Sequence, residues 1–256
     1  MKISLITVTY NSGNTLSYTI ESILSQSYSN IEYIIVDGAS KDNTVEIIKE
    51  YEPLFEGRMK WISERDKGLY DAMNKGIRMA TGDVIGILNS DDLFMDNKVI
   101  EDIATAFDYQ TKAIFGNLYF VDQVDINKIV RVWKGSPYKT FKSGWHPAHP
   151  TFYVRREIYE KYGVFDTTFD VSADFELMLR LIEKNAIQTK YLDRYMVKMR
   201  MGGESTGSIK NIIRGNKNIF RAFKKNGIPV SPLYPIYRLL PKIIDKIGYM
   251  IGFHKH

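Results

Sequence analysis

The chain has 256 residues, of which 44% are hydrophobic, so it suits one large α/β domain, alone or with an appendage. It contains no cysteine, which excludes disulfides, thiolate zinc sites and a cysteine nucleophile. The formal net charge is +5, and no run approaches the roughly 20 apolar residues that a membrane-spanning helix needs.

Strands and helices alternate along the first third of the chain. Apolar runs predict strands at 3–9, 31–36, 60–62 and 83–88, and helical spacing predicts helices at 14–26, 43–50 and 69–80. Further helices are expected from about Asn97 and from Asp174, and a strand at 151–154. Such alternation is typical of a mostly parallel sheet with helices on both faces, in which ligands bind beyond the carboxyl ends of the strands.

Polar residues follow each of the four strands. These clusters are Thr9-Tyr10-Asn11, Asp37-Gly38-Ala39-Ser40, Ser63-Glu64-Arg65-Asp66 and Asn89-Ser90-Asp91-Asp92. Any one of them fits a turn or a helix cap, but four at one sheet edge favour a ligand site. Adjacent carboxylates repel each other, so the last cluster favours Mg²⁺ or Mn²⁺ shared with the phosphates of a nucleotide. The alternative is an acidic turn that caps the following helix.

Several longer motifs carry a family resemblance. They are Ile6-Thr7-Val8-Thr9-Tyr10-Asn11, Val36-Asp37-Gly38-Ala39-Ser40-Lys41-Asp42-Asn43-Thr44, Glu64-Arg65-Asp66-Lys67-Gly68-Leu69-Tyr70-Asp71-Ala72-Met73-Asn74-Lys75-Gly76, Thr81-Gly82-Asp83, the acidic run, and Ser172-Ala173-Asp174-Phe175-Glu176-Leu177. The chain resembles family 2 glycosyltransferases, the inverting, bacterial surface-polysaccharide type, over about residues 1–203. The resemblance implies a GT-A, Rossmann-like α/β fold and a nucleotide-sugar donor.

The resemblance also assigns roles at the donor side. It implies that Asp37 and Asp66 contact the nucleoside, with Thr9, Tyr10 and Asn11 nearby. Asp37 also fits an Asp-Gly turn, and Asp66 a helix cap. Ser90 and Asp91 would contact the nucleotide.

The same resemblance places a divalent metal, Mn²⁺ or Mg²⁺, on Asp91 first and Asp92 second. Asn89 stands where the family's DXD signature usually has its first aspartate, and this weakens ligation there. The metal would clamp the diphosphate and stabilise the charge that builds as it leaves.

On the acceptor side, the resemblance makes Asp174 the general base, with Glu176 as a substitute. An inverting displacement needs one base opposite the leaving group. The alternative for Asp174 is a helix N-cap. His149, and less strongly His146, are expected at the acceptor or phosphate side. Arg200, before Gly202-Gly203, is expected either to pair with a phosphate or to lie in a linker.

The last part of the chain is basic. From Ser205 onward, ten lysines and arginines stand against one acid, Asp245. Apolar residues recur at helical spacing from Ile236 to Ile251 with basic residues between them, which predicts an amphipathic helix. We expect a catalytic domain over 1–204 and a helical extension over 205–256 that binds an anionic membrane surface. Packing on the catalytic domain or on a twin subunit is the alternative.

The resulting hypothesis is an inverting glycosyltransferase that moves a sugar from a UDP-sugar to a glycan or lipid-linked acceptor. Alternatives are a nucleotide-sugar-binding protein without turnover and a nucleotidyltransferase. Residues 1–8 are interrupted by polar residues too early for a signal peptide, so a cytoplasmic protein on the inner face of the plasma membrane is expected. No nucleic-acid module is recognised, and a homo-oligomer stays open.

Overall fold

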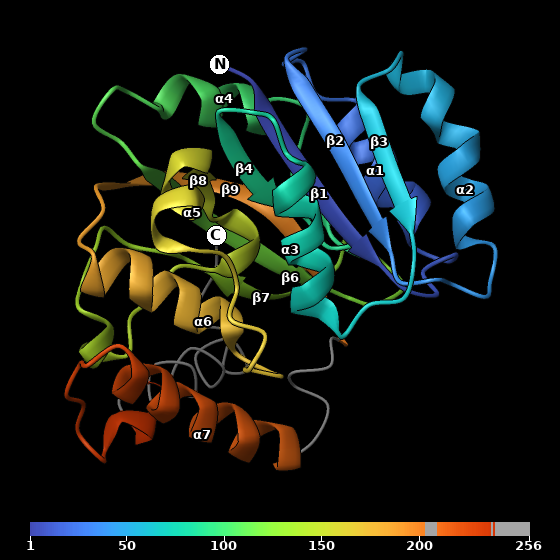
Figure 1. Cartoon of the computed structure of the whole chain (residues 1–256). Helices are drawn as coiled ribbons and strands as arrows, with labels where there is room; N and C mark the ends of the chain where they lie inside the picture. The colour runs from blue at the N-terminus through green and yellow to red at the C-terminus, as the bar shows by residue number, and fades with distance from the viewer. Residues whose placement is uncertain (203–208, 237, 239–256) are drawn as a thin grey trace.

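The computed structural model describes residues 1–202, 209–236 and 238. Its strands form one sheet in the order β3-β2-β1-β4-β8-β6-β9-β5, with β7 paired to β6 (Figure 1). The strands are β1 (Ile3–Thr9), β2 (Ile31–Asp37), β3 (Met59–Ser63), β4 (Val84–Ile87), β5 (Leu93–Phe94), β6 (Ala113–Val121), β7 (Ile129–Trp133), β8 (Tyr153–Arg155) and β9 (Thr189–Arg200). Strands β1 to β4, β6 and β9 run one way, and β5, β7 and β8 run the other way.

Helices cover both faces of this sheet. They are α1 (Leu16–Leu24), α2 (Thr44–Tyr51), α3 (Leu69–Met79), α4 (Val99–Ala106), α5 (Arg156–Tyr162), α6 (Ala173–Met178) and α7 (Ile209–Lys225). Short turns lie at η1 (Glu52–Phe55), η2 (Phe141–Ser143) and η3 (His149–Thr151), and α6 continues into the π-helical η4 (Leu179–Lys184). The predicted alternation of strands and helices is confirmed, and the predicted ends of the elements differ from the observed ones by at most two residues.

The helices form two layers, and each layer packs on one face of the sheet through its own apolar core. One core joins α3, α5, α6 and α7 to one face of the sheet, and the other joins α1, α2 and α4 to the opposite face. Strand β1 contributes side chains to both cores, because Ile6 and Val8 lie in the first core whereas Ile3 and Leu5 lie in the second. A strand buried on both faces reads as a continuous apolar run, which is the pattern of a parallel strand between two helix layers.

The extension beyond residue 204 packs in part on the rest of the protein. Helix α7 contributes Ile219, Ala222 and Phe223 to the first core, and Tyr234 joins them. The helix predicted over 236–251 lies almost entirely outside the described residues. Within the described part of the chain, no helix is long and apolar enough to cross a membrane. The division at residue 204 stays a prediction.

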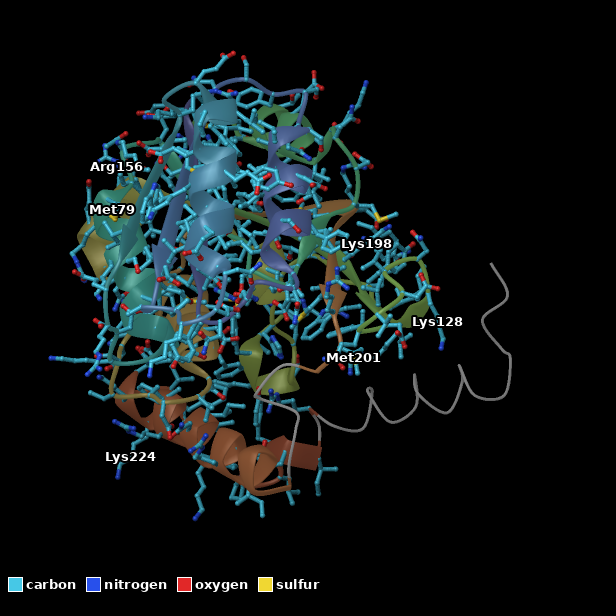
Figure 2. The ribbon with its side chains drawn as sticks, turned by 90° about the vertical axis from the view of Figure 1, so that its right-hand side faces the viewer. Met79, Lys128, Arg156, Lys198, Met201 and Lys224 are labelled. Atoms are coloured by element: carbon cyan, nitrogen blue, oxygen red, sulfur yellow. The ribbon has the colours of Figure 1, made fainter. Side chains whose placement is uncertain are left out.

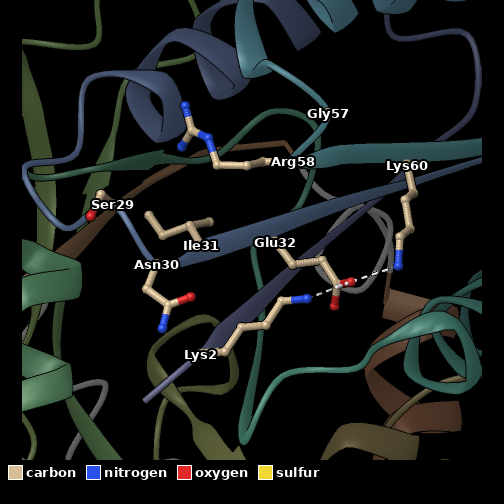
Figure 3. A pocket seen from close by; sticks show the side chains of 8 residues that line it. All are labelled: Lys2, Ser29, Asn30, Ile31, Glu32, Gly57, Arg58 and Lys60. Carbon is tan, nitrogen blue, oxygen red and sulfur yellow. Dashed lines mark hydrogen bonds and ion pairs between the residues drawn. The ribbon is translucent and has the colours of Figure 1, made fainter.

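A buried carboxylate ties together the end of the sheet where the parallel strands begin. Glu32 of β2 is 2% exposed and accepts hydrogen bonds from Lys60 Nζ (2.8 Å), Lys2 Nζ (3.1 Å) and Ser4 Oγ (2.6 Å). Thr81 adds bonds from its backbone N–H and its hydroxyl. Glu32 lines a cavity of about 190 Å³ whose rim carries both lysines (Figure 3). Burial alone would raise the pKa of Glu32, but these bonds hold it well below its usual range.

We expect Glu32→Gln to destabilise the protein by about 1–3 kcal/mol near pH 7, because it weakens several buried hydrogen bonds to a charged group. The folded pKa of Glu32 lies below its reference value of 4.5. The stabilisation is therefore present above that value and is lost as the pH falls toward the folded pKa. Urea unfolding at several pH values should show the largest difference from wild type near neutrality. Equal stability of the variant and the wild type near neutral pH would contradict the prediction. Glu46→Gln, at an exposed position of α2, is the control and should not change the stability.

Candidate active site

The parallel register brings the polar strand ends together. Thr9 of β1 pairs with Asp37 of β2, which pairs in turn with Ser63 of β3. On the other side of β1, Ile6 pairs with Ile87 of β4, and the Leu88 N–H continues the ladder to the Ile6 carbonyl (2.9 Å). The four polar clusters therefore lie at one edge of the sheet, as the sequence predicts.

Asp37 fixes the loops around it. Its side chain is fully buried and accepts bonds from Ser40 Oγ and Ser63 Oγ, each at 2.5 Å, and from the Ser40 N–H at 3.1 Å. Ser40 Oγ in turn accepts from the Asn11 N–H (2.8 Å). Asp37 thereby holds the loop after β1 against the loop after β2. A direct contact between Asp37 and a nucleoside stays a prediction.

Two of the predicted nucleoside residues, Tyr10 and Asp66, lie close to Gly38. A methyl group added there would lie 3.1 Å from Asp66 Oδ2 and 3.3 Å from Tyr10 Cδ2, so the missing side chain leaves a narrow space between them. Tyr10 is 61% exposed, and its ring is free to cover a flat ligand. Asp66 bonds Lys75 Nζ of α3 at 2.6 Å, which fixes the carboxylate in place.

The loops around this space hold unusual backbone and polar features. Asn11 and Ala39 have φ values of +51° and +61°, in the left-handed region that non-glycine residues rarely adopt. Such strain gathers at ligand sites in many proteins. Thr9 Oγ1 is buried without a hydrogen-bond partner among the described residues. Ser90 Oγ lies 2.9 Å from Ser12 Oγ and so links the acidic run to the loop after β1.

The two aspartates of the acidic run have different surroundings. Asp92 is 1% exposed, and its oxygens accept from Asn89 Nδ2 (3.0 Å) and the Arg200 N–H (3.3 Å). Burial and the neighbouring Asp91 raise the pKa of Asp92 well above its usual range. Burial also raises the pKa of Asp91, but Arg200 opposes this. Asp91 is only partly buried.

The donor set fits a divalent cation in part. The buried carboxyl group of Asp92 and the partly buried one of Asp91 repel each other when both are ionised, and a divalent cation relieves this repulsion. Asp91 suits the ligand role. Asp92 does not, because both of its oxygens are used inside the protein. No group of three acidic or histidine side chains suited to a metal occurs within the described ranges, so a substrate would have to supply further oxygen ligands.

Arg200 is the last residue of β9. Figure 2 labels the next residue in the chain, Met201. The Arg200 side chain is buried, with Nη1 donating to the Gln123 carbonyl (2.9 Å) and the guanidinium stacked over Tyr18. Arg200 Nε has no hydrogen-bond partner among the described residues. Arg200 therefore lies beside the acidic run, which the sequence did not predict, and its pairing with a phosphate stays a prediction. Gly203 and the residues to 208 lie outside the described residues.

Asp174 lies on α6 within a second group of polar residues. Ser172, with a φ of +66°, occupies the N-cap position, so Asp174 is not the cap of this helix. Asp174 Oδ1 accepts from the Tyr70 hydroxyl of α3 at 3.3 Å. Burial raises the pKa of Tyr70, and the charge of Asp174 raises it further. Burial lowers the pKa of His149 while Asp174 opposes that shift, which places His149 within electrostatic reach of Asp174.

Glu176 and His146 are placed differently from what the sequence suggests. Glu176 is 1% exposed and pairs with Arg180 Nε and Asn226 Nδ2, each at 3.1 Å, so its carboxylate anchors helices and these contacts argue against it as a substitute base. His146 packs edge-on against Trp133 and Phe175, and its Nδ1 lies 2.9 Å from the Pro147 carbonyl. Both roles given to them from the sequence stay predictions.

Comparison with known proteins identifies the family. The model of glycosyl transferase family 2 matches residues 4–181. The chain belongs to glycosyl transferase family 2. An uncharacterized glycosyltransferase of Mycobacterium tuberculosis is 32% identical over 182 residues, which cover 70% of this chain and 68% of that protein. A PGL/p-HBAD biosynthesis glycosyltransferase of Mycobacterium bovis is 24% identical over 250 residues, with 96% and 94% covered.

Solved structures agree on the fold. Residues 1–349 of S. aureus TarS, in complex with UDP-GlcNAc, superpose with a TM-score of 0.67 at 17% identity, covering 88% of this chain and 65% of that one. The mannosyltransferase PcManGT from Pyrobaculum calidifontis, in complex with GDP-Man and Mn²⁺, gives 0.66 at 19% identity, with 100% and 76% covered. The expected GT-A, Rossmann-like fold of this family 2 glycosyltransferase is confirmed.

Two contacts near Asp174 were not predicted from the sequence. The bond from Tyr70 to Asp174 joins residues 104 positions apart. The guanidinium carbon of Arg238, from beyond the matched segment, lies 6.0 Å from the ring centre of Phe175, the residue after Asp174. Tyr70 lies in one of the motifs that carry the family resemblance, so the sequence did indicate that this residue belongs to the site. Arg238 lies in no such motif.

We expect Asp91→Asn to weaken Mn²⁺-dependent binding of UDP at least about tenfold, because it removes the carboxylate best placed to share a cation with a diphosphate. Stability should change by less than about 1 kcal/mol, since the side chain is partly exposed. Calorimetric titration of UDP with MnCl₂ or EDTA measures the affinity. Equal binding by wild type and variant would contradict the assignment of Asp91 as a metal ligand. Asp125→Asn, in an exposed turn, is the control and should bind like the wild type.

Proposed function

We propose that this enzyme transfers a sugar from a nucleotide sugar, most simply a UDP-sugar, to a hydroxyl of a glycan or lipid-linked glycan, with inversion at the anomeric carbon. The observation that carries the proposal is the position of Asp174, bonded to Tyr70 and held on a helix that follows a strained residue. The nucleoside space at Gly38 and the acidic run at Asp91 support a donor on the neighbouring strand ends.

In the proposed reaction, Asp174 takes the proton of the acceptor hydroxyl as that oxygen forms a bond to the anomeric carbon. The bond from this carbon to the diphosphate oxygen breaks at the same time, and the nucleoside diphosphate leaves with the electron pair. Tyr70 orients Asp174 by its hydrogen bond. Arg200 places a positive charge beside the acidic run, where the leaving phosphate charge would build.

Asp91 would hold Mn²⁺ or Mg²⁺ together with the donor diphosphate. The cation supplies Lewis-acid stabilisation of the leaving group when it is bound. PcManGT was solved with GDP-Man and Mn²⁺, and TarS with UDP-GlcNAc and with UDP, so guanosine and uridine donors both deserve testing.

Two other functions remain as alternatives. A protein that binds nucleotide sugars without turnover would keep the donor side and make no use of Asp174. A nucleotidyltransferase with a similar sheet usually needs a basic, glycine-rich phosphate loop after its first strand. Residues 9–14 contain no basic side chain, which disfavours this class.

We expect wild-type protein to release a nucleoside diphosphate from one of UDP-GlcNAc, UDP-glucose or GDP-mannose with Mn²⁺ and not with EDTA. Asp174→Asn should lower this turnover at least about 100-fold, because it removes the base, and should leave the affinity for UDP within about twofold. Coupled detection of the diphosphate and calorimetry measure the two quantities. Full turnover by the variant would remove Asp174 from the mechanism, and binding without turnover by wild type would favour the alternative without catalysis.

We propose further that the enzyme works on an anionic membrane surface through its C-terminal extension. Helix α7 exposes Lys217 and Lys224 on the side away from the core, together with Ile213, which is 53% exposed. Figure 2 shows Lys224 at the α7 end of the molecule, away from Lys128. Basic and apolar groups on one helix face suit anionic headgroups, and an acceptor carried by a lipid would lie in the same surface.

Replacing Lys217 and Lys224 by Gln should weaken binding to vesicles of phosphatidylglycerol and phosphatidylcholine by about 2 kcal/mol, or roughly 30-fold, at about 1 kcal/mol per cation. Co-sedimentation at low and high salt measures this. Lys49→Gln with Lys128→Gln removes the same charge elsewhere and should bind like wild type. Wild-type protein that does not bind these vesicles would contradict the proposal.

A further inference from the structure

The 165–172 loop, which leads to Asp174, begins at a buried anchor. Asn74 of α3 is 4% exposed and bonds both backbone groups of Phe165: its Nδ2 donates to the carbonyl (2.8 Å), and its Oδ1 accepts from the N–H (2.9 Å). The Phe165 ring stacks on Tyr70, whose hydroxyl donates to Asp174. Helix α3 therefore fixes the start of the loop and also contacts Asp174 itself.

The loop ends at a second buried asparagine, which comes from α7. Asn218 is 9% exposed, and its Nδ2 donates to Asp170 Oδ1 (2.8 Å) and to the Val171 carbonyl (2.9 Å). These two bonds account for both hydrogens of the amide. The bond from Asn218 lowers the pKa of Asp170, so its acceptor is a carboxylate. Helix α7 thus holds the end of the loop although it lies outside the segment that the family model matches, residues 4–181.

The bond to Val171 bears on the strained residue that precedes α6. The Val171 carbonyl and the Ser172 N–H belong to one planar peptide unit, so a bond to this carbonyl fixes one side of the φ rotation of Ser172. Ser172 has φ +66° and ψ +22°, in the left-handed region, and its side chain makes no capping bond. A residue other than glycine keeps this conformation when its surroundings impose it. Asp174 lies two residues further along the chain, so its position depends on the conformation of Ser172.

Helix α7 also contacts the residues on either side of Asp174. A methyl group added at Gly215 would lie 3.6 Å from Ser172 Oγ, so the backbone of α7 closely approaches the residue that precedes α6. The ring of Phe223 packs edge-on against Phe175, with the ring centres 5.7 Å apart. Figure 1 shows α7 beside α6. The helix therefore packs on α6 as well as on the loop before it.

The ion pairs between α7 and the loop are more exposed than Asn218. Arg214 pairs with Asp170 at 3.2 Å, and the two side chains are 48% and 59% exposed. Lys225, which pairs with Asp166, is 51% exposed. Exposed pairs contribute little to stability, because water competes for both charges. Loss of a buried amide leaves its partners without a hydrogen bond and costs more. Asn218 is therefore the contact of α7 that is expected to matter most for the loop.

We propose that Asn218 is a positioning residue for Asp174: it fixes the peptide unit before Ser172 and so sets the direction in which α6 carries the carboxylate. This role rests on the proposed function of Asp174 as the base. A displacement of a catalytic group by about 1 Å can lower a rate by up to about 100-fold. The proposed donor side lies at the ends of β1, β2 and β4, so Asn218 acts on the transfer step and not on donor binding.

The test separates kcat from donor binding. In Asn218→Ala, kcat for donor turnover should fall about tenfold, while the donor KM and the affinity for UDP stay within about twofold. Steady-state assays and calorimetry measure these quantities, and the calorimetric stoichiometry gives the fraction of protein that is folded. Asn218→Leu, which fills a similar volume without an amide, repeats the test if the Ala variant folds poorly. Asn127→Ala, at an exposed asparagine in the turn between β6 and β7, should keep the wild-type kcat.

A double-mutant cycle distinguishes positioning from a general effect on the fold. In the Asp174→Asn background, Asn218→Ala should lower the residual turnover by less than about twofold, because the group that Asn218 positions is already absent. A merely structural role would lower the turnover by the same factor in both backgrounds. That outcome, an unchanged kcat in Asn218→Ala, or a raised donor KM at wild-type kcat would overturn the proposal.

The proposed function and the role of Asn218 fail in different ways. If wild-type protein turns over no nucleotide sugar, the proposed function fails. If wild-type protein is active and Asp174→Asn is not, but the two substitutions act independently, only the role of Asn218 fails.

Discussion

The parallel pairing of β1 with β2 and β4 is the constraint on which the site depends. Parallel strands with helical crossovers must all end at the same edge of the sheet, so residues distant in sequence share one surface. Thr9, Asp37 and Ser63 are in register at that edge. Asp37 then uses its buried carboxylate to hold the neighbouring loops, and only after this can Tyr10 and Asp66 face each other across Gly38.

The surroundings of the carboxylates separate structural roles from chemical ones. Glu32, Asp92 and Glu176 are buried and accept hydrogen bonds from other groups of the protein. These bonds stabilise the carboxyl groups within the fold and give them a structural role. Asp91 is partly buried beside another acid, and Asp174 accepts one long bond from Tyr70. Groups whose hydrogen-bonding capacity is not filled by the protein are the ones left for a cation or a substrate.

The sequence predicted the first half of the molecule well because short-range signals decide it. Apolar runs, helical spacing and the polar residues after each strand are all local, and β1 was predicted with its observed ends, Ile3–Thr9. The difference between Asp91 and Asp92 was not predictable in this way. The difference depends on the backbone N–H of Arg200, 108 residues away in the sequence, which donates a hydrogen bond to Asp92 and not to Asp91. Tyr70 and Arg238 were missed for the same reason, since tertiary contacts carry no spacing rule.

The basic extension shows how far net charge can be interpreted. A surplus of lysine and arginine after residue 205 indicated an anionic partner, and an external surface was the simplest one. Arg214, Arg221 and Lys225 instead bind the loop from Asp166 to Asp170. This loop is acidic, so part of the tail's charge is complementary to the catalytic domain itself. Lys217 and Lys224 are the remaining cations of α7 among the described side chains, and they can contact a membrane without loosening the loop that leads to α6 and Asp174. An extension that binds both surfaces would couple docking at the membrane to the geometry of the base.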